Sequence, residues 1–161
     1  AKEAEDRLVK LLNINGKKSM LDFHKELGAV VWDQIGMSRT KEGLEDAINK
    51  IRAIKEDFWT NLKLTGEKNT FNKYLEFAGR VADFIELAEL MAIDALHRNE
   101  SCGGHFREEY QTEEGEALRD DKNFLYVSAW EYKGDDVEPK LHKEPLVYEN
   151  IEVKQRNYKS A

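Results

Sequence analysis

The segment FNKYLEFAGRVADFIELAELMAIDALHR, residues 71–98, carries the strongest structural signal in the chain. Apolar residues recur at intervals of three and four, the spacing of an α-helix, so we expect one long helix from Phe71 to about Arg98. One apolar face holds Tyr74, Ala78, Val81, Ile85, Ala88, Ala92 and Ala95, and an adjacent face holds Phe77, Phe84, Leu87 and Met91. A helix with so wide an apolar arc requires neighbours on two sides.

Two further long helices are expected before this segment. Ser19 is a typical N-cap with Asp22 in the first turn, where a negative charge is favourable, and Gly36 ends the helix that they begin. Thr40 caps the next helix, whose near-heptad spacing is typical of a narrow packing seam. The apolar residues of the two helices are Phe23, Leu27, Val30, Val31 and Ile35, then Leu44, Ala47, Ile48, Ile51, Ile54, Phe58 and Leu62.

Together these helices predict a mainly α protein. Three long helices with short connections favour an antiparallel three-helix bundle of the spectrin-repeat kind, in which each helix contributes a stripe to a shared core. A short amphipathic helix with Leu8 and Leu11 precedes the bundle, and its truncated appearance suggests that it begins further upstream. We expect residues 1–99 to form the bundle and residues 100–161 a Gly/His loop and a β-prone tail, as one structural unit.

Two β-prone runs are expected in the tail, FLYVSAWEY at 124–132 and LVYENIEV at 146–153. They can pair as a hairpin. The intervening KGDDVEPKLHKEP contains both prolines of the chain and favours a long loop over a tight turn. Two strands alone are marginally stable, so the tail is expected to pack on the bundle or on another domain.

Composition limits the classes of function. The chain of 161 residues has 25 Lys and Arg against 32 Asp and Glu, and a net charge of -7 disfavours nucleic-acid binding. A single cysteine makes no internal disulfide, which is typical of a reducing cytoplasm. No apolar run approaches the roughly 20 residues that span a bilayer, so membrane association is expected only through a partner.

The stretch NESCGGHFREEY, residues 99–110, places the only cysteine three positions before a histidine. His105 could activate Cys102 as a thiolate nucleophile, but no orienting residue is evident. His97, Cys102 and His105 are all zinc-ligand types, although structural zinc sites usually contain more cysteines at paired short spacings. We favour a structural thiol. The sequence also lacks nucleotide-binding and serine-hydrolase motifs, so on its own residues the chain presents no catalytic, cofactor or metal site.

Two separated motifs nevertheless resemble one family. The run RNESCGGHFREEY at 98–110, followed by RDDKNFLYVSAWEY at 119–132, resembles the C-terminal signature of succinate dehydrogenase and fumarate reductase flavoprotein subunits, approximately E-S-R-G-A-H-x-R-x-D-[FY]-P-x-R-D-D. Upstream, VWDQIGMSRTKEGLEDAINKI at 31–51 is similar to the family's W-x-x-[VI]-G-[IM]-x-R-x-x-x-G-L segment. Two motifs in the right order are far more specific than one.

The signature matches this chain residue by residue, with departures. The matched positions are Glu100, Ser101, Gly103, Gly104 in place of Ala, His105, Arg107, Tyr110, Arg119, Asp120 and Asp121. Cys102 stands where the family has arginine, so a contact of that arginine does not carry over. Glu109 stands where the family has aspartate before the aromatic residue. The insertion TEEGEAL lengthens the path to Arg119, and the usual proline is missing.

The resemblance implies a place within a larger enzyme. In the family, upstream FAD-binding and capping domains hold the covalent flavin, the dicarboxylate site and the proton-shuttling arginine, and electrons leave through an iron-sulfur subunit. The chain would then be an excised C-terminal domain without a cofactor of its own, inactive alone. The resemblance also implies a cytoplasmic location, peripheral at the inner face of the plasma membrane, with only indirect contact to a membrane anchor.

Glycine and arginine chemistry in the signature is consistent with a joint between domains. Gly103 and Gly104 permit close backbone approach, while His105, Arg107 and Arg119 offer donors across a domain boundary. We therefore expect the matched residues from Glu100 to Asp121 to form a docking motif, although Arg119 with its two neighbouring aspartates can equally form a local salt-bridged turn. Alternatives are a domain of a related flavoprotein, L-aspartate oxidase or adenylylsulfate reductase, or an independent helical adaptor.

Overall fold

A computed structural model describes residues 1–67, 69–135 and 137–154. The chain is mainly α, as predicted. The helices are α1 (Lys2–Asn13), α2 (Met20–Gln34), α3 (Lys41–Asn61), α4 (Lys73–His97) and α5 (Asp121–Phe124). The strands are β1 (Lys18–Ser19), β2 (Ser38–Arg39), β3 (Leu62–Lys63), β4 (Phe106–Arg107), β5 (Tyr126–Glu131) and β6 (Lys140–Pro145).

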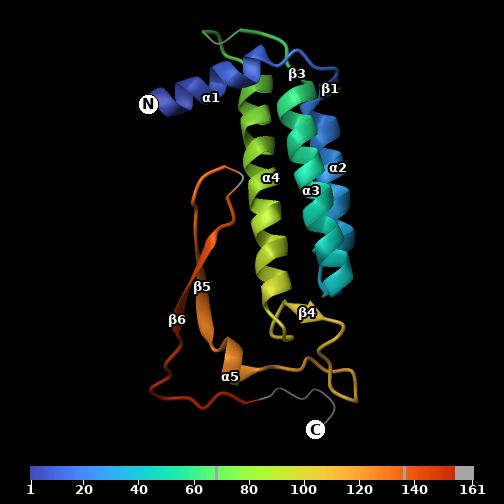
Figure 1. The fold of residues 1–161 in the computed structure, drawn as a ribbon, viewed down its shortest axis with the longest axis vertical. Helices are drawn as coiled ribbons and strands as arrows, with labels where there is room; N and C mark the ends of the chain where they lie inside the picture. Colours follow the sequence, from blue (N-terminus) through green and yellow to red (C-terminus); the bar gives the residue numbers. More distant parts are fainter. Residues whose placement is uncertain (68, 136, 155–161) are drawn as a thin grey trace.

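Helices α2, α3 and α4 lie side by side along the long axis of the molecule (Figure 1). We call these three helices the helical core. The α1 helix crosses near the start of α4, and Arg7 of α1 bonds Asp83 of α4 at 2.6 Å. Within the described part of the chain, no helix is both long enough and apolar enough to span a bilayer.

The predicted caps are confirmed at both earlier helices. Ser19 Oγ accepts a hydrogen bond from the backbone N–H of Asp22 at 3.2 Å, and the Asp22 carboxylate accepts one from the backbone N–H of Ser19, which completes a capping box. Thr40 Oγ1 accepts from the N–H of Gly43 at 3.0 Å. The α4 helix begins slightly later than predicted because Asn72 is its N-cap.

Replacing Ser19 with alanine removes the acceptor for the first turn of α2. We expect the free energy of unfolding to fall by about 1 kcal/mol, as for other N-cap losses. Urea denaturation followed by circular dichroism measures the change. Ser19→Asn, which keeps a side-chain acceptor, is the matched control and should cost at most a few tenths of that amount. Equal losses in the two variants would show that capping is not the cause.

The core forms where the three helices meet. Phe23 and Leu27 of α2 lie against the apolar stripe of α3, and Phe23 packs edge to face on Phe58 with ring centroids 5.2 Å apart. Small side chains on α4 allow close helix approach. The buried residues of α3 and α4 are Leu44, Ala47, Ile48, Ile51, Ile54, Phe58, Leu75, Ala78, Val81, Ala82, Ile85, Ala88, Ala92 and Ala95.

The first predicted face of α4 is buried except at its start. Tyr74 is exposed and Leu75 is buried in its place, because Tyr74 lies in the first turn, beside the Asn72 cap. The second face is covered only in part. Phe77 and Phe84 both contact the ring of His24 in α2. Phe84, Leu87 and Met91 are nevertheless 40%, 54% and 43% exposed. Described residues therefore cover one side of α4 and leave most of the other open.

A short parallel ladder lies at each end of the helical core (Figure 1). Strand β1 pairs with β3, with Lys18 opposite Leu62. At the other end β2 pairs with β4, so that Arg39 lies opposite Arg107. The second ladder joins the α2–α3 connection to the segment after α4. The upstream sequence motif includes that connection, and the C-terminal signature includes that segment.

The expected hairpin is present, but its second strand was wrongly predicted. Strand β5 pairs antiparallel with β6 at 140–145, whereas residues 146–153 form no strand. Pro145 occupies the last position of β6, where a missing N–H is tolerated. The hairpin extends along α4 (Figure 1), where Trp130 Nε1 donates to Asp94 Oδ1 at 2.7 Å.

Candidate functional site at the glycine turn

A tight turn follows α4 at the Cys-Gly-Gly-His stretch. The backbone N–H of Cys102 donates to the carbonyl of His105 at 2.8 Å, and the N–H of His105 donates back at 3.0 Å. Gly103 has a φ of 59°, a region that glycine enters without steric cost. Both central glycines are exposed. The turn is therefore closed by two backbone hydrogen bonds, and its glycines are exposed at the end of the helical core.

The His105 ring is held by hydrogen bonds at both nitrogens. Nδ1 lies 2.6 Å from Arg39 Nη1, and Nε2 lies 2.9 Å from the backbone carbonyl oxygen of Arg98. A guanidinium only donates and a carbonyl only accepts, so these partners require a neutral ring with its proton on Nε2. Burial, and then the guanidinium groups of Arg39, Arg107 and Arg98, lower the pKa of His105, although the Arg98 carbonyl opposes this change.

Arg39 and Arg107 each cover the C-terminal end of a helix. Arg39 Nε donates to the carbonyl oxygens of residues 35 and 36, at 3.0 and 2.8 Å, at the end of α2. Arg107 Nη1 donates to those of residues 95 and 96, at 3.1 and 3.3 Å, in the last turn of α4. Arginine is favourable there because the last carbonyls lack helical partners and carry a partial negative charge. We call Arg39 and Arg107 the arginine pair.

Glu100 and Ser101 are buried and bonded within the chain. The Glu100 carboxylate accepts from Arg98 Nη1 and from the backbone N–H of Asp120, both at 2.8 Å. Ser101 Oγ accepts from the backbone N–H of Arg107 at 2.8 Å and donates to the carbonyl of the same residue at 3.1 Å. Arg107 itself is 1% exposed. These side chains fasten the segment after α4 to the helical core and present no free surface.

Arg119 forms the local pair that the sequence left as an alternative. Its Nε and Nη2 atoms donate to Asp121 Oδ1 at 3.0 and 2.6 Å. Asp120 accepts from the backbone N–H of Asn123 at 3.2 Å as the N-cap of α5. The three residues are half-buried. A docking role for them stays a prediction.

The geometry does not support the two chemical readings of Cys102. Because both ring nitrogens of His105 are already bonded, the ring cannot serve as a base for the thiol. His97 Nε2 lies 2.9 Å from the Tyr126 hydroxyl instead of facing Cys102. Among the residues that the structure describes, no group of three or more His, Cys, Asp or Glu side chains is placed to hold a metal ion.

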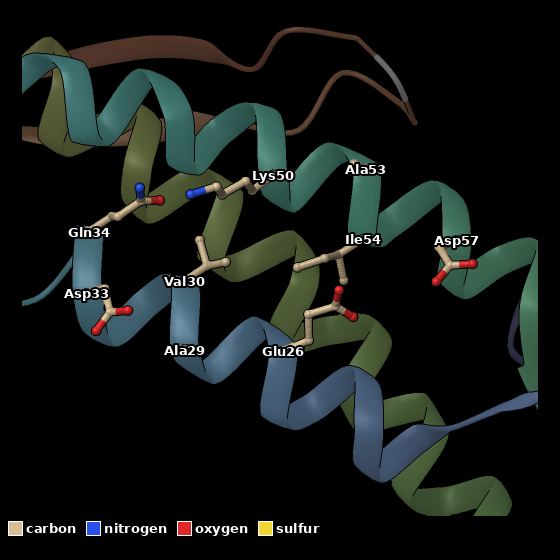
Figure 2. A pocket seen from close by; sticks show the side chains of 9 residues that line it. All are labelled: Glu26, Ala29, Val30, Asp33, Gln34, Lys50, Ala53, Ile54 and Asp57. Atoms are coloured by element: carbon tan, nitrogen blue, oxygen red, sulfur yellow. The ribbon is translucent and has the colours of Figure 1, made fainter.

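A groove of about 610 Å³ lies between α2 and α3 (Figure 2). Its apolar lining includes Val30 and Ile54. The carboxylates of Glu26 and Asp57 both bind the ammonium group of Lys18. The described residues that line the groove include no Cys, Ser or His side chain.

A second groove of about 920 Å³ lies between α1, α3, α4 and the hairpin loop. Trp59, Trp130 and Tyr132 are among its lining residues. Arg52 ties this loop to the helical core through Glu89 at 2.7 Å and Glu138 at 2.8 Å. The described lining again includes no Cys, Ser or His side chain.

The structure brings the two sequence motifs into one site. Glu100, Ser101, Gly103, Gly104, His105 and Arg107 lie around the end of α4, and Arg119, Asp120 and Asp121 lie on the next segment of chain. Sequence reasoning missed Arg39 and Arg98, which hold His105. Arg39 lies inside the upstream motif, so its place in that motif was the available signal.

Comparisons with known proteins agree with the motifs. The sequence profile of the family described as "Fumarate reductase flavoprotein C-term" matches residues 24–158. The fumarate reductase flavoprotein subunit of Serratia sp. is 32% identical over 125 residues, which cover 78% of this chain and 20% of that protein. The succinate dehydrogenase flavoprotein subunit of Bacillus subtilis is 24% identical over 109 residues, which cover 68% of this chain and 18% of that protein.

A solved structure of Escherichia coli quinol fumarate reductase superposes with a TM-score of 0.81 at 27% identity. The superposition covers 96% of this chain and 25% of the other. The chain thus spans about a fifth of the length of the two curated relatives. Since the family profile matches most of the chain, the chain belongs to the family of fumarate reductase flavoprotein C-terminal domains.

Proposed function

We propose that the chain is the C-terminal domain of the flavoprotein subunit of a succinate dehydrogenase or fumarate reductase, an enzyme that interconverts succinate and fumarate. The observation that carries the proposal is the family match across residues 24–158. The parent subunit would hold FAD in its upstream domains and pass electrons to the clusters of an iron-sulfur subunit. The domain itself would be structural and would dock those parts.

Exposed apolar side chains support a docking role. Trp32 on α2 is 84% exposed, and Phe84, Leu87 and Met91 form the open face of α4. Large apolar groups left in water are unfavourable, and a contiguous patch of them is typical of an interaction surface. Under the proposal, the FAD-binding and capping domains cover these exposed side chains.

The glycine turn is the second proposed contact. Its exposed Gly103 and Gly104 allow another backbone to approach, while Glu100, Ser101, His105 and Arg107 hold the turn in place from inside. Arg119, Asp120 and Asp121 would extend the contact along the tail. Under the proposal, the inner side chains of the docking motif hold the exposed glycines in position for the contact.

The remaining expectations complete the proposal. The helical core would be an antiparallel three-helix bundle of the spectrin-repeat kind, and residues 1–99 and 100–161 would form one structural unit. The parent complex would lie on the cytoplasmic side of the plasma membrane and reach its anchor only through partner subunits.

Purified alone, the chain should be helical, colourless and inactive. The flavin site and the dicarboxylate site would lie in upstream domains, so neither yellow absorbance nor succinate-dependent dye reduction is expected from the 161 residues. The matched control is the full-length parent subunit, which should be yellow and active. Flavin that copurifies with the isolated chain would contradict the proposal.

A second candidate is a related flavoprotein such as L-aspartate oxidase or adenylylsulfate reductase. Its ground is that the subunits of those enzymes carry related C-terminal domains, so the resemblance of this domain alone does not separate them. Assaying the full-length protein with succinate, L-aspartate and adenylylsulfate in parallel separates the candidates. Turnover of succinate alone supports the first proposal.

A further inference from the structure

His105 connects three separate segments of the chain through one ring. Its backbone belongs to the glycine turn, its Nδ1 atom is bonded to Arg39 on β2, and its Nε2 atom is bonded to the carbonyl that follows α4. Arg39 in turn holds the end of α2. The ring therefore joins the ends of α2 and α4 to the turn between α4 and β4.

The charges around this ring are unevenly distributed. Guanidinium groups face it from each neighbouring element, Arg39 on β2, Arg98 after α4 and Arg107 on β4. The nearby carboxylates of Glu100 and Glu109 are bonded to two of these arginines, not to the ring. A second proton would convert Nδ1 from an acceptor into a donor and set it against the Arg39 N–H, which remains protonated.

We propose that His105 is a proton-operated latch: the neutral ring holds the Arg39 segment against the end of α4, and a protonated ring releases the β2–β4 ladder and the glycine turn while the helical core stays folded. The latch resides in the geometry of this chain and does not depend on the reaction of the parent enzyme. Its ligand is the proton alone.

The sign of the pH effect follows from the direction of the pKa change. In the open form the ring has the ordinary pKa of about 6.5, whereas in the closed form that pKa is lowered. The closed form is therefore fully favoured above about pH 6.5 and loses stability as the pH falls below it. The ratio of open to closed chains rises by at most about tenfold per pH unit, until the lowered pKa is reached.

NMR of the histidine ring tests, without any substitution, whether His105 is neutral with its proton on Nε2. In the 161-residue chain at about pH 7.5, the ¹⁵N shifts of His105 should report the proton on Nε2, and its titration midpoint should lie below about 6.5. A ring with its proton on Nδ1, or a midpoint at or above the ordinary value, would overturn the proposal.

Hydrogen exchange tests the release. The backbone N–H of Glu108 donates to the carbonyl of Arg39 at 2.9 Å, so its protection reports on the ladder. After correction for intrinsic rates, this protection should fall between about pH 7.5 and 5.5, by up to about tenfold. Backbone amides in the middle of α4, near Ile85, should keep their protection from exchange. A change of less than about twofold at Glu108, or an equal loss at both places, would overturn the latch.

A matched pair of variants assigns the effect to this histidine. His105→Gln supplies an oxygen toward Arg39 and an N–H toward the Arg98 carbonyl but takes up no proton, so the loss at Glu108 should disappear. His24→Gln, on the exposed side of α2, should behave as the unmodified chain. Burial lowers the pKa of His97 as well. A loss that persists in His105→Gln would therefore come from His97 or another titratable group and would overturn the proposal. Mass-spectrometric exchange on peptides containing Glu108 applies the same comparison to the full-length subunit.

Discussion

Replacing Arg107 with alanine is expected to lower the free energy of unfolding by about 3–5 kcal/mol, because it removes a large buried side chain together with its hydrogen bonds to helix carbonyls. Arg107 is 1% exposed and donates to the carbonyls of residues 95 and 96 and to Glu109. The variant leaves those carbonyls without their donor and opens a cavity the size of the side chain. No other described side chain is shown to donate to them.

The measurement is urea denaturation with tryptophan fluorescence and circular dichroism. Arg80→Ala is the matched control, because Arg80 is exposed on α4 and, among the residues that the structure describes, pairs with Glu76 one turn away. Its loss should stay within about 0.5 kcal/mol. Arg107→Lys keeps the charge but not the planar set of N–H donors. Its loss of unfolding free energy should lie between those of Arg107→Ala and Arg80→Ala. A loss below about 1 kcal/mol in Arg107→Ala would show that the buried arginine does not stabilise the end of α4.

Replacing Phe58 with alanine should cost a similar amount, about 3–5 kcal/mol. The ring is fully buried between α2 and α3 and contacts two others edge to face, Phe23 at 5.2 Å and Trp59 at 5.3 Å between centroids. The cost combines lost burial with the cavity that remains, because close-packed helices relax only in part.

Phe71 provides a control of the same chemistry. It lies just before α4 and is 96% exposed, so Phe71→Ala removes an identical side chain from water. We expect its effect to stay within about 0.5 kcal/mol by the same denaturation assay. Phe58→Leu, which keeps most of the volume, should cost less than Phe58→Ala. Comparable losses for the two phenylalanine-to-alanine variants would mean that the core around Phe58 is loosely packed.

The helices could be predicted from sequence because their signals are local. Ser19 and Thr40 cap the helices that follow, and the spacing of apolar residues in α3 and α4 matches the faces that the structure buries. Tyr74 was assigned to the buried face because periodicity does not show where the packing of a helix begins. The partial exposure of Phe84 follows from what covers α4, which lies beyond any local pattern.

The second strand of the hairpin shows the limit of β-propensity. Residues 146–153 are richer in β-formers than residues 140–145, yet strand β6 is the latter. Register is set by loop length and by pairing partners, and a pairing that starts at Lys140 needs a shorter loop than one that starts at Leu146. Propensity alone cannot represent that preference.

The site was predictable only in part for a related reason. The motif around His105 was found by resemblance, but the role of each side chain depends on partners far away in the sequence. Arg39 lies 66 positions before His105, and no spacing rule connects them. The prediction of donors for another domain therefore missed that Arg107 donates within its own chain.

The β2–β4 ladder also sets an order of events during synthesis. A ribosome that adds about 5–20 residues per second needs roughly 3–13 s to make the stretch that separates Arg39 from His105. Once α3 has been made, the nascent chain can pair α2 with α3, while Arg39 has the carbonyls at the end of α2 to bond. The ladder therefore forms late, and a ribosome pause between α4 and β4 would leave the three core helices made but without the contacts of Arg107 and His105 at their ends.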